Sequence, residues 1–177
     1  SLGDSLSNLT NLTHLTFGSE FDHHLQTSLH NLKKLTHLTF GHHFNNHLGT
    51  SLSELTQLTH LAFGDRFNQC LENSFGNVTN LTQLTFDQSL GDSLSNLTNL
   101  THLTFGNEFG YHPLQTSLHN LKKLTHLTLG NEIDPLGPLA DSLSTLKRLF
   151  HLTFDETNFD RPLHVHDKLT GAPTFDF

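Results

Sequence analysis

Cysteine, methionine and tryptophan are almost absent from this sequence, whose 177 residues include one Cys, no Met and no Trp. A single Cys excludes an internal disulfide framework and paired-thiolate metal sites. No apolar run approaches the roughly 20 residues that span a bilayer as a helix, and no signal-peptide pattern is visible at the start. We therefore expect no membrane partner. Scarce cysteine fits a reducing compartment, which favours an intracellular location while leaving the compartment open.

Basic residues are also scarce, with 9 Lys and Arg against 17 Asp and Glu. The formal charge of -8 makes a large basic nucleic-acid footprint improbable, so no nucleic-acid partner is expected. The 16 His residues titrate near neutral pH, and protonating all of them would change the charge from -8 to -8 + 16 = +8. Acidic pH should therefore alter this surface strongly.

Hydrophobic residues make up 34% of the chain, below the roughly 45–50% of compact globular domains. Leu and Phe account for 37 + 15 = 52 of them, and they recur at fixed intervals. The string His-Leu-Thr-Phe-Gly, or a near variant, begins at seven positions separated by 23, 23, 23, 19, 24 and 25 residues. These positions are His14, His37, His60, Gln83, His102, His126 and His151. Such a period is typical of stacked structural repeats.

Each repeat combines a strand pattern with a turn pattern. Leu15-Thr16-Phe17 alternates as in a strand, whereas Leu29, Leu32 and Leu35 recur every third residue, as in a 3₁₀ turn. One unit is too small to bury its apolar face, so the units should stack. We predict an α/β repeat solenoid within a single domain, residues 1–177, built from seven to eight repeats of 19–25 residues. It should be a right-handed coil with a parallel sheet on the concave side and short 3₁₀ or turn segments on the convex side. Strands are predicted near 14–17, 37–40, 60–63, 83–86, 102–105, 126–129, 151–154 and 174–177.

The two ends of the array carry further expectations. Residues 1–18 recur unchanged at 89–106, and the second copy follows a strand pattern. We therefore expect an N-terminally truncated array, with another strand before residue 1. An uncapped strand edge is a template for pairing, so a homodimer through such an end is one expected partner arrangement.

Four segments give the repeats a more specific resemblance. They are Phe21-Asp22-His23-His24-Leu25, Phe44-Asn45-Asn46-His47-Leu48, Phe67-Asn68-Gln69-Cys70-Leu71 and Phe159-Asp160-Arg161-Pro162-Leu163. With the leucine pattern, they resemble the FNIP type of leucine-rich repeat, which is abundant in slime moulds and large amoeba viruses. The resemblance implies a leucine-rich-repeat fold and a module that binds another protein. The position of Asx is taken by Gly110 in one copy, and the copy after Phe86 lacks the Phe-Asx step.

The predicted outward face of the sheet carries the candidate binding residues. Parallel register should place like residues side by side, which gives one column of His or Gln and a second column of Thr next to it. Neighbouring imidazoles should then stand about 5 Å apart. The candidates are His14, Thr16, His37, Thr39, His60, Gln83, Thr85, His102, Thr104, His126, Thr128, His151 and Thr153. Three hypotheses remain open for this column: a solvated surface, a concave face that binds a protein, and a metal-binding surface. Adjacent imidazolium ions repel, so we expect the pKa values of these histidines to be lowered in the folded protein. Folding stability should then decrease as the pH drops.

Metal binding and catalysis are less favoured by the pattern. A flat column offers two or three ligands on one side, whereas zinc sites normally have four in a tetrahedron. His164-Val165-His166-Asp167 is a second possible ligand set. No cofactor is expected. Ser, His and Asp recur in every copy, but a catalytic triad requires one singular geometry. We therefore predict a non-catalytic binding or scaffold module. A Thr/His surface that orders water or ice is an alternative, although Ala62 interrupts the Thr column.

Overall fold

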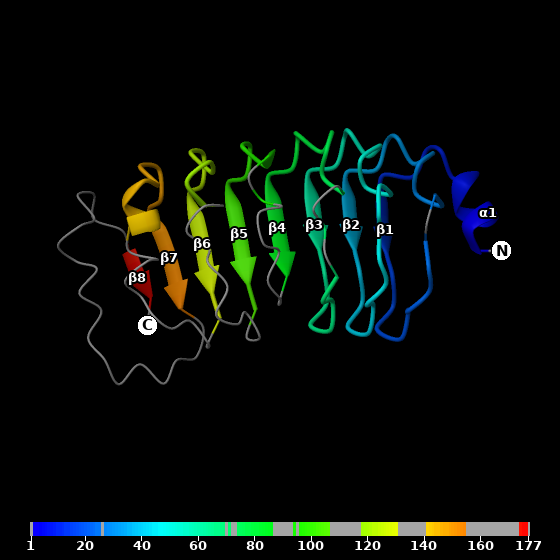
Figure 1. The fold of residues 1–177 in the computed structure, drawn as a ribbon, viewed down its shortest axis with the longest axis horizontal. Coiled ribbons are helices and arrows are strands. Elements are labelled where there is room, and N and C mark those ends of the chain that lie inside the picture. The colour runs from blue at the N-terminus through cyan, green and yellow to red at the C-terminus, as the bar shows by residue number, and fades with distance from the viewer. Residues whose placement is uncertain are drawn as a thin grey trace.

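Eight parallel strands stand side by side in chain order in the computed structural model (Figure 1). The structure describes residues 2–25, 27–69, 71, 74–86, 94, 96–106, 118–130 and 141–154, and the backbone of 174–176. The strands are β1 (His14–Thr16), β2 (His37–Thr39), β3 (His60–Ala62), β4 (Gln83–Phe86), β5 (His102–Phe105), β6 (His126–Leu129), β7 (His151–Phe154) and β8 (Thr174–Asp176). Every strand begins at the residue where its predicted range begins.

The sheet order β1-β2-β3-β4-β5-β6-β7-β8 shows that each repeat adds one strand to the same edge. Equivalent residues pair across every step from β1 to β7, so that Leu38 lies between Leu15 and Leu61. The 19-residue repeat keeps this register, because Leu84 pairs with Leu103. The predicted leucine-rich-repeat-like solenoid with a parallel sheet is therefore confirmed.

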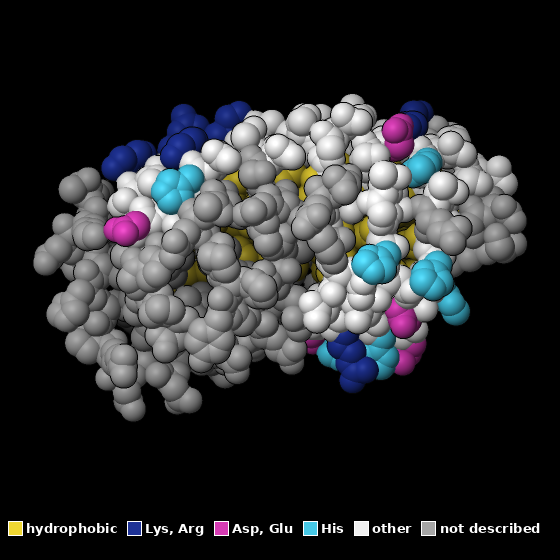
Figure 2. All heavy atoms as spheres, in the orientation of Figure 1, with side chains coloured by type: hydrophobic (Ala, Val, Ile, Leu, Met, Phe, Trp, Pro, Cys, Tyr) yellow, Lys and Arg dark blue, Asp and Glu magenta, His cyan; other side chains and the backbone are white. Residues whose placement is uncertain are grey.

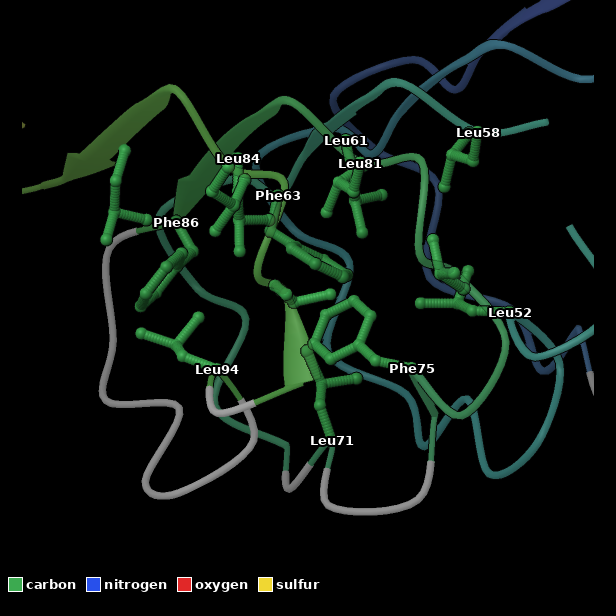
Figure 3. Close-up of a cluster of buried hydrophobic side chains, with 14 of the residues drawn as sticks. Leu52, Leu58, Leu61, Phe63, Leu71, Phe75, Leu81, Leu84, Phe86 and Leu94 are labelled. Atoms are coloured by element: carbon green, nitrogen blue, oxygen red, sulfur yellow. The ribbon is translucent and has the colours of Figure 1, made fainter. Parts of the chain in front are cut away.

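Leu and Phe side chains of the strands fill the interior of the coils (Figure 3). Along β4 to β7, buried and accessible residues alternate, as a half-buried strand requires. Leu61, Leu84 and Phe86 of the strands point into the interior that Leu52, Leu58 and Leu81 of the returning chain also fill (Figure 3). The buried residues form one continuous cluster from Leu6 to Phe154, which explains how a chain poor in hydrophobic residues has a core.

Turns spaced by three residues lead the chain back into each strand. The backbone N–H of Leu32 donates to the carbonyl oxygen of Leu29 at 3.0 Å, and that of Leu35 donates to Leu32 at 2.9 Å. All three leucines are fully buried. Hydrogen bonds between residues i and i-3 are those of a 3₁₀ turn, so the predicted short turn segments are present here.

Phenylalanine rings form two parallel ladders in the first three coils. Phe40 stacks between Phe17 and Phe63, at centroid distances of 5.5 and 5.1 Å. Phe44 stacks between Phe21 and Phe67, at 6.0 and 5.9 Å. Within a coil the two ladders touch, because the rings of Phe40 and Phe44 are 4.2 Å apart. In these coils the Phe before the Asx therefore belongs to the interior: Phe44 and Phe67 are buried, and Phe21 packs against the core.

Asp22 and Asn45, which follow Phe21 and Phe44, link consecutive coils. The backbone N–H of Asn45 donates to Asp22 Oδ1 at 3.0 Å, and the N–H of Asn68 donates to Asn45 Oδ1 at 2.9 Å. Gln69 Nε2 donates to the same Asn45 oxygen at 2.9 Å. Asp and Asn both supply this acceptor, which explains why the position accepts either residue.

A short helix, α1 (Leu2–Ser7), precedes β1 and was not predicted from the sequence. Its Leu6 is buried and joins the core of the first coil. Other sequence features lie outside the described residues, namely Gly110, residues 159–163 and the possible ligand set at 164–167. Predictions that concern those segments remain predictions.

Candidate functional site

All thirteen candidate residues lie on the face of the sheet that points away from the core. In β2, the buried Leu38 is flanked by the half-exposed His37 and Thr39, and the same pattern recurs along the sheet. We call this surface the outer sheet face and define it by a histidine column and a threonine column. The histidine column is His14, His37, His60, Gln83, His102, His126 and His151. The threonine column is Thr16, Thr39, Ala62, Thr85, Thr104, Thr128 and Thr153.

The imidazoles of the histidine column stack face to face. Ring centroids are 4.2 Å apart for His14 and His37, and 4.0 Å apart for His37 and His60, with interplanar angles of 13° and 12°. His102 and His126 form a second stack at 4.2 Å and 10°. Gln83 lies between the two groups in register and is exposed.

A third column, of threonines, precedes the histidines and was missed in the sequence analysis. The hydroxyl of Thr36 donates to the carbonyl oxygen of Thr13 in the preceding coil at 3.0 Å. Thr59, Thr82, Thr101 and Thr125 repeat this bond at 2.9–3.1 Å. We call these residues, Thr13 included, the threonine ladder. The signal was available in the sequence, because a Thr precedes the first six members of the histidine column.

The threonine ladder also orients the imidazoles. The distance from the threonine Oγ1 to the Nδ1 of the following histidine is 2.8 Å for His37 and His60, and 2.9 Å for His14, His102 and His126. Phe150 replaces the threonine before His151. There the ring is tilted 39° from that of His126, and its Nε2 lies 3.0 Å from Thr153 Oγ1. Threonine at the ladder position thus accompanies the stacked orientation.

Partial burial lowers the pKa of His37, and the positive charges that His60 and His14 carry when protonated lower it further. Burial likewise lowers the pKa of His126, with smaller contributions from His102 and His151. The predicted direction is confirmed for these two imidazoles, but the expected cause is only secondary. Neighbouring rings account for the desolvation. His14 and His60 stack on His37, whereas His102 stacks on His126 and Phe150 meets it edge-on at 4.8 Å.

The stacked geometry does not suit a metal ion held between neighbouring histidines. Parallel rings direct their Nε2 lone pairs side by side, whereas a shared ion needs lone pairs that converge on it at about 2.0–2.1 Å. Among the described residues, no group of three or more His, Cys, Asp or Glu side chains is arranged to hold a metal. The threonine column is in register but is interrupted by Ala62. The water-ordering hypothesis stays an untested prediction.

Charged side chains lie in the segments at the two ends of the strands. Lys and Arg side chains gather along one long edge, over the chain that enters β6 and β7 (Figure 2). In the first coils, Lys33 pairs with Glu54 and Lys34 donates to Asn11 at 2.7 Å. At the other ends of the strands, His43 lies 3.2 Å from Glu20 and His42 lies 2.7 Å from Asp65. No helix within the described part of the chain is long and apolar enough to cross a membrane.

Comparisons with known proteins find likeness in structure alone. No protein-family model matches the sequence, and no curated protein matches it. The chain is similar to CroV588, described as a novel circular LRR protein, with 32% identity over 84% of this chain and a TM-score of 0.65. The chain spans only 21% of the length of CroV588.

Two further solved structures share the architecture. Internalin C2 from Listeria monocytogenes is 24% identical, with a TM-score of 0.69 over 97% of this chain and 73% of its own. The plant peptide hormone receptor RGFR1, solved in complex with RGF2, is 22% identical, with a TM-score of 0.51 over 85% of this chain and 26% of its own. At these identities the likeness concerns the fold. The structural neighbours of this chain are leucine-rich-repeat proteins.

Proposed function

We propose that this chain is a non-catalytic leucine-rich-repeat module of the FNIP type that binds a protein partner through its outer sheet face. The observation that carries the proposal is the composition of that face. One face of the sheet packs on the buried Leu and Phe core. The opposite face, on seven strands in register, presents accessible His, Gln and Thr side chains to solvent. Repeat proteins commonly use such extended surfaces for recognition.

The FNIP assignment is supported by what the motif residues do. Phe44 is buried in the core, and Asn45 Oδ1 accepts a hydrogen bond from the backbone N–H of Asn68 in the next coil. Both motif positions therefore have structural roles that repeat along the stack. The outer sheet face is left for recognition, because its side chains are not needed to close the core. The structural neighbour RGFR1 was solved in complex with RGF2, which supports the same use of the fold here by analogy.

Affinity capture with matched variants tests the proposal. Thr39→Glu with Thr128→Glu places charge and bulk on the outer sheet face, while Thr56→Glu with Thr79→Glu makes the same change at exposed turn positions. Changing His37, His60, His102 and His126 to Ser is a second outer-face variant. Candidates from the capture are purified and their affinities measured directly.

We expect both outer-face variants to lose a partner that the turn variant retains at wild-type affinity. Equal loss in the turn variant, or full binding by the outer-face variants, would contradict the proposal. The predicted homodimer through an end of the solenoid remains a separate prediction, which sedimentation of the purified chain checks.

A further inference from the structure

Four threonine hydroxyls each make two polar contacts with a single hydrogen. Thr59 Oγ1 donates to the carbonyl oxygen of Thr36 at 3.0 Å and lies 2.8 Å from His60 Nδ1. The same two contacts are made by Thr36, Thr101 and Thr125. A hydroxyl has one hydrogen and two lone pairs. When the hydrogen is donated to the carbonyl oxygen, which also accepts the backbone N–H groups of Thr59 and His60, the hydroxyl oxygen accepts from Nδ1, and Nδ1 carries a proton.

A neutral imidazole with its proton on Nδ1 has a bare lone pair on Nε2. We propose that the threonine ladder holds His37, His60, His102 and His126 in this Nδ1–H form, so that the outer sheet face accepts N–H donors from arginine and lysine side chains of its partner. This rests on the proposed function and deepens it, because it states the chemistry of the partner segment. The ladder threonines are positioning residues, whereas the four histidines make the contact.

Phe150 provides a comparison within the same chain. It takes the ladder position before His151, cannot accept a hydrogen bond from Nδ1, and is 54% exposed. His151 turns out of the stack and directs Nε2 toward Thr153 instead. His126, which follows Thr125, keeps the stacked orientation. Loss of one hydroxyl therefore goes with a change in which ring nitrogen bonds to the protein.

The four Nε2 atoms are available to a partner. Among the described residues, a single side-chain nitrogen or oxygen is both buried and without a hydrogen-bond partner, namely Nε2 of His30, outside the column. Any Nε2 of the four column histidines that lacks a partner is therefore open to solvent. No hydrogen bond joins Nε2 of His37, His60, His102 or His126 to another described residue. Ring spacings of 4.0–4.2 Å place these acceptors in two short rows.

The partner that fits these rows is rich in donors and poor in acceptors. A carboxylate oxygen would face the Nε2 lone pair with no hydrogen between them. Arginine and lysine carry five and three donors, respectively, and no acceptor. The formal charge of -8 also favours a cationic segment. Three of the lysines near the ends of the strands already have partners within the chain. They are Lys33 with Glu54, Lys34 with Asn11, and Lys123 with Asn99.

The protonation state is measured on the free protein. Long-range ¹H–¹⁵N correlation spectra at pH 8 distinguish a protonated ring nitrogen from a bare one by chemical shift. We expect Nδ1 protonated and Nε2 bare for the four histidines. Thr59→Val removes one hydroxyl and should shift His60 toward the Nε2–H form while leaving His102 unchanged. Nε2–H forms in the wild type, or no change in His60 in a folded variant, would overturn the assignment.

Binding is measured with an arginine–glycine repeat peptide and a glutamate–glycine peptide of equal length, both at pH 8 and physiological salt. His37→Phe with His60→Phe keeps an aromatic stack and the net charge but removes two acceptors. His24→Phe with His47→Phe makes the same change at two exposed positions outside the column. We expect the column variant to bind the arginine peptide about tenfold more weakly than the wild type does. The control variant should bind it with the affinity of the wild type.

Equal binding by the column variant would show that overall charge alone attracts the peptide and would overturn the proposal. Preference for the glutamate peptide would do the same. These failures are distinguishable from failure of the proposed function, because the Thr39 and Thr128 variants test the face with its own partner. A face that binds a partner but ignores the arginine peptide keeps the function and loses the donor chemistry.

Discussion

The imidazole of His37 lies parallel to that of His60, with ring centroids 4.0 Å apart. Two charges at this distance repel by about 4 kcal/mol at an effective dielectric constant of about 20, before screening by the solvent that reaches both rings. The stack therefore suits neutral rings, and full protonation of the column opposes it.

Folding stability should decrease as the pH falls. The pKa of His37 and of His126 is below the ordinary value of 6.5 in the folded protein, so the unfolded chain binds more protons below that pH. The stability contributed by these neutral rings is complete above pH 6.5 and is lost as the pH falls through the lowered pKa values. Thermal unfolding between pH 7.5 and 5 measures the effect.

The matched variant replaces His37 and His126 with Gln, the residue that the column already contains at position 83. We expect a smaller fall in melting temperature over the same pH range than in wild type. His24→Gln with His47→Gln should leave the wild-type slope unchanged. An identical slope in all three proteins would refute this assignment.

Gly41 is required by the close approach of two coils. A Cβ atom at this position would lie 2.0 Å from the carbonyl oxygen of Gly18, whereas a Cβ at Gly18 would meet nothing within 4 Å. Gly41→Ala should destabilise the fold by about 1–3 kcal/mol, and Gly18→Ala should change it by less than about 0.5 kcal/mol. Denaturant unfolding of the two variants compares them, and equal stabilities would show that the coils separate without cost.

Phe44 stabilises the stack from inside. Its side chain is fully buried between Phe21 and Phe67, whereas Phe150 is 54% exposed. Phe44→Ala should cost about 3–5 kcal/mol of unfolding free energy, and Phe150→Ala, which removes a half-exposed ring that meets His126 edge-on, should cost clearly less. Urea titrations followed by circular dichroism measure both. A small loss for Phe44→Ala would mean that the phenylalanine ladders do not hold the coils together.

Asp22 links two coils through an acceptor that Asn can supply as well. Asp22→Ala removes the partner of the Asn45 N–H and should cost about 0.5–1.5 kcal/mol. Asp22→Asn keeps an oxygen at the same position and should restore most of that loss. If the Asn and Ala variants lose the same stability, the charge of Asp22 matters and the hydrogen bond does not.

The repeat period made most of the fold predictable. Because Leu38 and Leu61 occupy the same place in their repeats, stacking the repeats fixes the register without any knowledge of distant contacts. The outer sheet face followed from the alternation around each Leu. Helix α1 was not predicted, because residues 2–7 were treated only as a copy of residues 90–95 and no element was assigned to them.

The threonine ladder could have been read but was not. Its sequence signal, Thr before His, is plain, yet the bond from Thr36 to the carbonyl of Thr13 depends on how one coil sits on the next. The pKa of His37 shows the same limit. Repulsion follows from spacing along the sequence, whereas burial of the ring depends on the stacked geometry.

Chemical footprinting of the histidines tests the central claim most directly. Diethyl pyrocarbonate modifies accessible neutral imidazoles, and peptide mass spectrometry locates each modified residue. With the partner recovered by affinity capture bound at saturation, we predict that His37, His60, His102 and His126 become protected while His24 and His47 stay reactive. Column histidines that react equally in the free protein and in the complex would contradict the outer sheet face as the binding surface.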